Sequence, residues 1–356
     1  MLVYGDDSLA VRFKNNRVLP IIAVIVCVVA VTAFTLYDAS VHTREYNRSD
    51  VVMGSVVSLR LHGPGGERYA DQILERLKYI EEANPSRSLA GADIYRVNLS
   101  GEEGSIVSGN TVKWLERALK ICKDSDGALD ITLGRLTELW DFDSGQNLPP
   151  EPEEIESRLP FVGWEKVNLK GNTVTLSKGQ ALDMGALGKG IACDEAADIL
   201  KKYNVKSAII SVGGSVLLFG KENVRVGIRD PKGSVSDYMG TLKLKNKFIS
   251  TSGNYEKSFT FDNVLYHHLL DAKTGYPARS GLVSVTVVCD SGLDSDALST
   301  ACFVRGIEKS LPLLEKYNAQ AVFITEGDKV FVTEGLSDNL KITNEAYVLT
   351  SDIKAQ

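Results

Sequence analysis

The chain has 356 residues, of which 44% are hydrophobic and 24% charged, so it can form one large domain or two smaller ones with a real core. Its net charge of −6 comes without a basic run or an RNA-binding signature, which argues against nucleic acid as a partner. The five cysteines are widely spaced and form no CxxC pair or Cys/His cluster, which disfavours zinc and thioredoxin-like sites. Cys193 and Cys302 stand among small apolar residues and are expected to be buried thiols.

An uncharged apolar segment lies near the N-terminus. Residues 18–37, VLPIIAVIVCVVAVTAFTLY, are about as long as a helix must be to cross the hydrocarbon core of a bilayer. Arg12, Lys14 and Arg17 precede it, which by the positive-inside tendency keeps residues 1–17 in the cytoplasm. We therefore predict a single-pass anchor in the cell membrane, with the rest of the chain on the extracytoplasmic side.

Two alternatives remain open for this segment. A cleaved signal peptide would have an unusually long apolar core here, and no clean A-x-A site follows it. A buried helix of a soluble domain is the second alternative. The polar residues 38–50 that come next are typical of a juxtamembrane linker.

The rest of the chain is predicted to form one globular domain, residues 51–345, with a short tail at 346–356. Alternating or β-branched residues predict single strands at 51–63, 207–220, 224–231 and 282–290. Hairpins or short strands are predicted at 147–176, 239–277 and 319–335. The first of these follows a Pro/acid-rich loop and has KGNT as its turn. Apolar residues at helical spacing predict helices at 68–85, 106–127, 188–205, 294–306 and 306–318, while residues 130–142 are ambiguous. Helices and hairpins mix without regular βαβ alternation, so we predict an α+β fold with mixed or antiparallel sheets and packed helices.

One loop, residues 182–194 (LDMGALGKGIACD), places glycines and a lysine directly before a predicted helix. Free N–H groups at a helix start, together with Lys189, suit a phosphate group. The loop is not a Walker A motif, because Ile191 follows GKG where Ser or Thr would be required. The alternative is a tight strand-to-helix turn with no ligand.

A second stretch, DSDALSTACF (residues 294–303), brings carboxylates to the start of a helix that is otherwise small and apolar. Charge at the edge of a core costs free energy unless something pairs with it. Asp296 and Thr300 are four residues apart and share one helix face, so they can offer two hard oxygen ligands to Mg²⁺. The alternative is capping by Ser295 or Asp294, with Asp296 complementing the helix dipole.

A third region, YHHLLDAKTGYP, contains two of the four histidines, His267 and His268. Neighbours on a strand point to opposite faces, so at most one of the two can face a given site. A histidine there could act as a general base or contact a phosphate. The alternative is a half-exposed strand histidine beside a turn.

The motifs VVMGSVVSL, DGALDIT, LDMGALGKGIACD, ISVGGSVLLFG, ISTSGNY, HHLLDAKTGYP and DSDALSTA occur in this order and together resemble the ApbE family, the FAD:protein FMN transferases. The resemblance runs from about Val51 to Val332. It implies an enzyme that binds FAD as substrate, requires Mg²⁺, and transfers FMN to a Thr or Ser hydroxyl of a target protein with release of AMP. It also implies targets outside the cytoplasmic membrane, such as redox-complex subunits or electron-transfer proteins.

The resemblance also implies roles for individual residues. Asp296 and Thr300 would bind the metal through their side chains and Ala186 through its carbonyl, and His268 and Asp296 would be catalytic. The FAD-binding positions would be Met53, Ser88, Ala128, Leu129, Asp130, Asp183, Lys189, Ser252, Gly253 and Leu270. A bound Mg²⁺ and the FAD pyrophosphate would then give the Asp296 carboxylate its partner.

The chain departs from the family pattern in three places. Ser88 stands where the family often has an aromatic residue, Ala92 stands where it has a serine, and Ala272 replaces a common proline. The first departure bears on how a ring of FAD is held. Two other functions stay open: an FAD pyrophosphatase that makes FMN and AMP, and a non-catalytic membrane-anchored FAD-binding protein.

Overall fold

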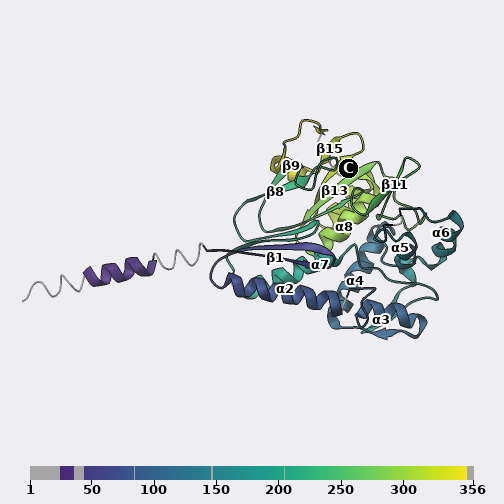
Figure 1. The fold of residues 1–356 in the computed structure, drawn as a ribbon, viewed down its shortest axis with the longest axis horizontal. Helices are drawn as coiled ribbons and strands as arrows, with labels where there is room; N and C mark the ends of the chain where they lie inside the picture. The colour runs from purple at the N-terminus through teal and green to yellow at the C-terminus, as the bar shows by residue number, and fades with distance from the viewer. Residues whose placement is uncertain (1–24, 36–43, 84, 146, 204, 351–356) are drawn as a thin grey trace, which may run out of the picture. The chain divides into compact units, whose positions relative to one another are not determined.

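The computed structural model describes residues 25–35, 44–83, 85–145, 147–203 and 205–350 (Figure 1). Of the predicted anchor, only residues 25–35 fall within this part, and they form an exposed helix; residues 1–17 lie outside the described residues. Among the described residues, no helix is both long and apolar enough to cross a membrane.

The domain that begins at Glu45 is built on a nine-stranded sheet. Its strands are, in spatial order, β1 (Glu45–Val52), β2 (Ser55–His62), β6 (Ser207–Val212), β7 (Ser215–Phe219), β10 (Lys247–Gly253), β13 (Leu282–Cys289), β14 (Gln320–Thr325), β15 (Lys329–Val332) and β17 (Val348–Leu349). Neighbouring strands are antiparallel except β15 and β17, which are parallel. The mixed sheet confirms the predicted α+β fold.

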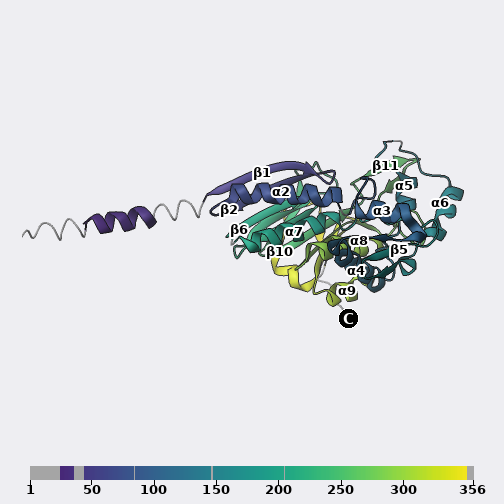
Figure 2. The ribbon, with the colours of Figure 1, turned by 90° about the horizontal axis from the view of Figure 1, so that it is seen from below.

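Helices pack on one face of this sheet and enclose the main core (Figure 2). They are α2 (Gly66–Ala83), α4 (Gly109–Asp124), α7 (Gly188–Lys202), α8 (Gly292–Arg305) and α9 (Ile307–Lys316). The sequence predicted all five because their apolar residues recur at helical spacing. Cys193 and Cys302 are buried in this core, as predicted.

A small second sheet covers part of the opposite face. It consists of β8 (Val224–Arg229), β9 (Tyr238–Leu244) and β16 (Leu340–Ile342). Ile228 and Leu242 of this sheet are buried in one cluster with Ile249 of β10. The nine-stranded sheet is therefore covered on both faces.

Three further α-helices and five short strands complete the described α-helices and strands of this domain. They are α3 (Asp93–Ser100), β3 (Ser105–Ile106), α5 (Gly134–Trp140), α6 (Pro152–Arg158), β4 (Asn168–Lys170), β5 (Thr173–Thr175), β11 (Ser258–Phe261) and β12 (Val264–His267). The predicted hairpin with its KGNT turn is β4–β5. The ambiguous residues 130–142 contain α5, whose Trp140 belongs to a separate apolar cluster.

Two predictions of single strands were wrong. Residues 51–63 and 207–220 each contain two strands joined by a two-residue turn, at Met53–Gly54 and at Gly213–Gly214. Met53, Gly54 and Gly213 have φ angles of +56°, +63° and +54°, as tight hairpin turns of this kind require. Apolar residues flank each turn, and the glycines within it were its signal in the sequence.

Strand pairing in the large sheet extends to residues that the sequence placed outside the globular domain. β1 begins at Glu45, inside the expected linker 38–50, because its largely exposed residues gain hydrogen bonds from β2. β17 lies in the expected tail, where it pairs with β15.

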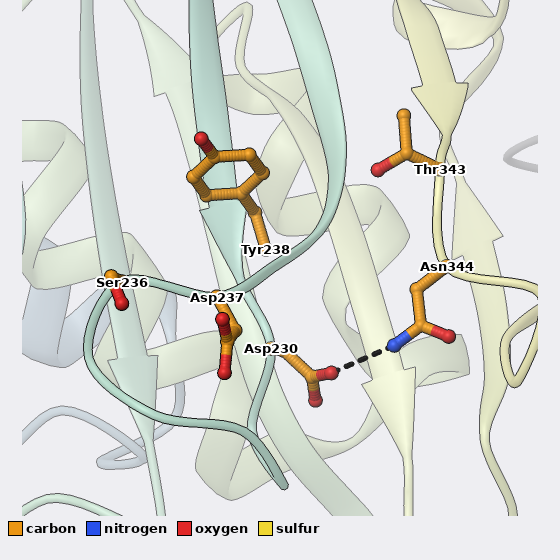
Figure 3. Close-up of a pocket in the computed structure, with 6 residues that line it drawn as sticks. All are labelled: Asp230, Ser236, Asp237, Tyr238, Thr343 and Asn344. Atoms are coloured by element: carbon orange, nitrogen blue, oxygen red, sulfur yellow. Dashed lines mark hydrogen bonds between the residues drawn. The ribbon is translucent and has the colours of Figure 1, made fainter.

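The segment before β17 is fastened to the small sheet by one buried carboxylate. Asp230 accepts a hydrogen bond from Asn344 Nδ2 at 2.8 Å (Figure 3). It also accepts hydrogen bonds from the Tyr347 hydroxyl and from the Lys232 N–H. Burial alone would raise the pKa of Asp230, but these donors outweigh it and lower the pKa. The hollow beside it, about 450 Å³ in volume, is therefore lined by a carboxylate that is already satisfied.

Candidate active site

One large cavity brings most of the predicted site residues together. Its volume is about 940 Å³, and it is lined by the β6–β7 turn, the end of β10, the loop before α7 and α8. The predicted residues that line it are Ser88, Ala128, Leu129, Asp130, Asp183, Ala186, Lys189, Ser252, Gly253, His268, Leu270, Asp296 and Thr300. Met53 does not line it, and packs near Gly188, where an added Cβ would lie 3.5 Å from Met53 Cε.

The start of α8 is held in place by α7. The Asp194 carboxylate accepts hydrogen bonds from the backbone N–H groups of Gly292 at 2.7 Å and Leu293 at 2.8 Å. A carboxylate at a helix N-terminus satisfies free donors and complements the helix dipole. Capping at α8 is thus done by Asp194, together with Ser291, rather than by Asp294 or Ser295. Asp294 instead forms a bidentate ion pair with Arg117.

Asp296 is the buried acid of the cavity, with 4% of its surface exposed. Its Oδ2 accepts a hydrogen bond from the Gly190 N–H at 2.9 Å, and its Oδ1 accepts one from the Ser215 hydroxyl at 3.2 Å. Burial raises the pKa of Asp296, while the positive charge of Lys189 and these two donors oppose the rise. The carboxylate therefore sits where an added cation would be stabilising.

The metal ligands implied by the resemblance lie on the wall of the same cavity. Thr300 follows Asp296 by one helical turn, and its hydroxyl lies 3.2 Å from that of Ser252. Ala186 lies in the loop before α7. A carboxylate, a hydroxyl and a backbone carbonyl form a hard-oxygen donor set that suits Mg²⁺ when substrate phosphates and water complete it. Within the described residues, no group of three His, Cys, Asp or Glu side chains could hold a metal.

Of the histidine pair, only His268 lines the cavity, in agreement with the prediction that neighbours face opposite ways. His267 is buried against the Phe303 ring. The His268 Nδ1 lies 3.0 Å from the Glu256 carbonyl oxygen. Since a carbonyl can only accept, Nδ1 carries the hydrogen and Nε2 keeps its lone pair. Burial lowers the pKa of His268 to about 4, so the ring is neutral near pH 7.

Side-chain contacts fix the loop of residues 182–194, which contains the glycines and Lys189. The Asn98 side chain pairs with both backbone groups of Leu182, at 2.7 and 2.9 Å. The Asp183 carboxylate accepts a hydrogen bond from the Gly185 N–H at 2.8 Å and forms an ion pair with Arg87 at 3.2 Å. These bonds hold the backbone that leads Lys189 into the cavity.

Other predicted residues line the cavity in ways that limit their chemistry. The Asp130 carboxylate accepts hydrogen bonds from Thr132 and from the Trp164 N–H, so it organises its own loop. Leu270 pairs with Pro277 and contributes an apolar wall. Ser88 offers a hydroxyl where a ring was expected, and the neighbouring Arg87 also lines the cavity.

Several residues that line the cavity were not predicted from the sequence, above all Arg229 and Tyr255. The Arg229 guanidinium carbon lies 4.7 Å from the centre of the Tyr255 ring. The stretch VRVGIRDP indicated only a strand, although a charged residue at the end of an apolar strand, next to Asp-Pro, is a signal of an element end facing a site. Gly213 and Gly214 of the SVGGSV stretch line the cavity as well.

Comparisons with known proteins agree on one family. The sequence profile of the ApbE family matches residues 53–324. A Treponema pallidum (strain Nichols) protein named FAD:protein FMN transferase is 31% identical over 337 residues, covering 86% of this chain and 91% of its own. A protein of the same name from Klebsiella pneumoniae (strain 342) is 28% identical over 295 residues, covering 82% of this chain and 92% of its own.

Solved structures give the same result. The crystal structure of an ApbE protein from Thermotoga maritima has a TM-score of 0.76 and 32% identity, covering 82% of this chain and 98% of its own. The apo flavinyl transferase ApbE of Pseudomonas stutzeri has a TM-score of 0.71 and 25% identity, covering 85% of this chain and 95% of its own.

Proposed function

This chain belongs to the ApbE family, and from that premise we propose that it is an FAD:protein FMN transferase. The observation that carries the proposal is the cavity in which Asp296, Thr300, Lys189 and His268 converge. It combines hard oxygen ligands, a cation and a neutral base. These are the groups that transfer of a phosphate-linked nucleotide to a hydroxyl requires.

We further propose that FAD binds with its pyrophosphate near Lys189 and that the reaction depends on Mg²⁺. Asp296 and Thr300 would hold the ion by their side chains and Ala186 by its carbonyl. When bound, Mg²⁺ would polarise the pyrophosphate and neutralise charge on the AMP leaving group.

His268 is suited to the role of general base. Its Nε2 would take the proton of the acceptor hydroxyl while that oxygen forms a bond to the FMN phosphorus. The bond from this phosphorus to the AMP oxygen breaks, and AMP leaves with the bonding electrons. The Nδ1–H bond to the Glu256 carbonyl orients the ring and selects the tautomer that this step needs.

The test uses the full chain in detergent with FAD, Mg²⁺ and a candidate acceptor domain. The intact mass of the acceptor and the released nucleotide are measured together. A mass gain of one FMN with matching AMP, abolished by a chelator, supports the transferase. Release of both FMN and AMP without a mass gain on any of several acceptors would identify an FAD pyrophosphatase. Tight FAD binding without turnover would identify a flavin carrier.

We also propose that residues 18–37 anchor the enzyme in the cell membrane and that it modifies an extracytoplasmic acceptor, such as a redox-complex subunit or an electron-transfer protein. The length of the apolar segment and the basic residues before it support this. Carbonate washing of membranes and protease treatment of spheroplasts test it. Release into the wash, or full protection from protease, would contradict the proposed topology.

A further inference from the structure

A tight turn, residues 254–257, leads from the end of β10 to the start of β11. Other strands fix both of its ends. The Asn254 N–H donates to the Val283 carbonyl oxygen of β13 at 3.0 Å. Ser258, directly after the turn, pairs with His267 of β12. Residues 255–257 therefore make the whole passage from the large sheet to the β11–β12 hairpin.

Two backbone carbonyls of this turn hold His268. The His268 Nδ1–H donates to the Glu256 carbonyl oxygen at 3.0 Å, and the His268 backbone N–H donates to the Lys257 carbonyl oxygen at 3.2 Å. One bond fixes the ring, and the other fixes the backbone that carries the ring. The φ and ψ bonds of Lys257 lie between these two carbonyls, so they set how both are oriented toward His268.

Lys257 has a left-handed backbone, with φ at +41°. Among the described residues, the other non-glycine residues with positive φ are Asn or Asp, which tolerate this region, apart from Met53 in the β1–β2 turn. Strained residues of this kind persist where surrounding contacts determine them, and they cluster at functional sites. The side chain does not explain the strain, because the Lys257–Asp143 ion pair joins two largely exposed groups and contributes little.

We propose that Lys257 is a positioning residue for the proposed proton transfer and that it acts through its left-handed backbone rather than through its charge. This conformation lets the carbonyls of Glu256 and Lys257 accept hydrogen bonds from His268 together. The ring is thereby held with its hydrogen on Nδ1 and its lone pair on Nε2. The inference rests on the proposed function, in which His268 takes the proton of the acceptor hydroxyl.

The first test compares kcat for FMN transfer among full-chain variants of Lys257. A β-branched valine is strongly disfavoured at positive φ, whereas glycine and asparagine tolerate it. All three lack the lysine charge, so differences among them report the backbone. We expect Lys257→Val to lower kcat about 10- to 100-fold, because a displacement of about 1 Å can cost about 10² in rate. Its KM for FAD should equal that of Lys257→Gly. Lys257→Gly and Lys257→Asn should restore kcat to within about threefold of the wild type.

The second test observes the ring directly, without turnover. ¹⁵N NMR of the histidine rings identifies the His268 signals as those that His268→Ala lacks. The wild type and Lys257→Gly should show the Nδ1–H form. Lys257→Val should also show the Nε2–H form, because the hydrogen bond that selects the tautomer is lost. In a His268→Ala background, Lys257→Val should cause no further loss of kcat, since both changes act on one step.

Asn246→Val is the matched control. Asn246 has a φ of +46°, precedes β10 at its other end, and is exposed outside the cavity. Its replacement should lower stability as Lys257→Val does and leave kcat unchanged. Equal kcat in the Val and Gly variants of Lys257 would overturn the inference, as would an unchanged tautomer in Lys257→Val or a further loss of kcat in the His268→Ala background.

The Gly and Asn variants decide the matter if Lys257→Val does not fold. A loss of kcat beyond about tenfold in both would show that the lysine side chain, not the backbone, is required. A wild-type chain that transfers FMN to none of several acceptors would overturn the proposed function instead, and the NMR comparison would still test how Lys257 holds the His268 ring.

Discussion

Gly190 of α7 and Gly292 of α8 touch backbone to backbone. A Cβ added to Gly190 would lie 2.1 Å from the Gly292 carbonyl oxygen, and one added to Gly292 would lie 2.2 Å from the Gly190 oxygen. Only glycine allows this approach at either position. The approach brings the Gly190 N–H to 2.9 Å from the Asp296 carboxylate. Gly190 and Gly292 therefore set the distance between α7 and α8, the helices that carry Lys189 and Asp296 to the cavity.

The contact predicts that Gly190→Ala is severely destabilising. The clash is with backbone, which cannot rotate away, so α7 and α8 must separate at a cost of about 3 kcal/mol or more. Activity should fall with stability because Asp296 loses the Gly190 donor. Thermal and urea unfolding measure the change. Gly109→Ala at the start of α4 is the control, since its added Cβ meets nothing within 4 Å. Equal stability of the two variants would contradict the close approach.

The buried Asp296 carboxylate predicts opposite effects on stability and activity. Asp296→Asn removes a charge whose burial is costly, and the amide can still accept from Gly190 and donate to Ser215. Without metal, the variant should be as stable as the wild type or more so, while FMN transfer should fall by at least about 100-fold. Mg²⁺ at 100 times its Kd should add about 2.7 kcal/mol to the stability of the wild type and nothing to the variant.

Differential scanning calorimetry with and without Mg²⁺ measures both stabilities. Ser299→Ala is the control, because Ser299 lies on the same helix and contacts Ser252 but does not line the cavity. It should keep the Mg²⁺ response even if the loss of its buried hydrogen bond lowers the overall stability. A Mg²⁺ response that survives in Asp296→Asn would show that Asp296 is not a ligand.

Two of the stretches that the sequence singled out contribute residues to the wall of one cavity. Residues 182–194 and 294–303 carry their own signals, because glycines before a helix and acids at a helix start act within one turn. The order of these loops along the chain also indicated the family. Their convergence in one cavity depends on strand order in the large sheet, which periodicity alone does not specify.

The parts that the sequence missed depend on tertiary contacts. Arg229 and Tyr255 are on different elements, and nothing local indicates that one covers the other. Asp194 resembles an ordinary exposed acid of an amphipathic helix, yet it caps α8 across the helix interface. The turn at Gly213–Gly214 is an exception, because a Gly-Gly pair between two strand-like runs is itself a local hairpin signal.

The low pKa of His268 predicts an unusual pH profile. A base must be neutral to accept a proton, and the pKa of His268 is lowered to about 4, mainly by burial. The loss of transfer due to its protonation should therefore occur near pH 4 rather than near about 6.5, with no histidine-dependent change between about pH 6 and 8. His268→Ala should lower kcat about 10²- to 10⁴-fold and remove this acidic limb.

The profile of kcat against pH, measured with the same candidate acceptor domain, checks this role. His62→Gln is the control, because His62 lies on β2 outside the cavity and pairs with Glu45. It should keep both the rate and the profile. Full transfer by His268→Ala at every pH would remove His268 from the proton transfer.

The Asp230 cluster predicts a stability that depends on pH. Its carboxylate has a folded-state pKa below the unfolded value, so the stability it contributes is present above the unfolded pKa of about 3.9 and is lost as the pH falls. Tyr347→Phe removes one donor to this buried charge and should cost about 2 kcal/mol at pH 7. The difference from the wild type should shrink below about pH 4, where the carboxyl group becomes protonated in the variant first. Urea unfolding at several pH values measures it. Tyr238→Phe, in the same hollow but with an exposed ring, should cost little at any pH, and a pH-independent loss in Tyr347→Phe would show that packing, not the charge, fastens this segment.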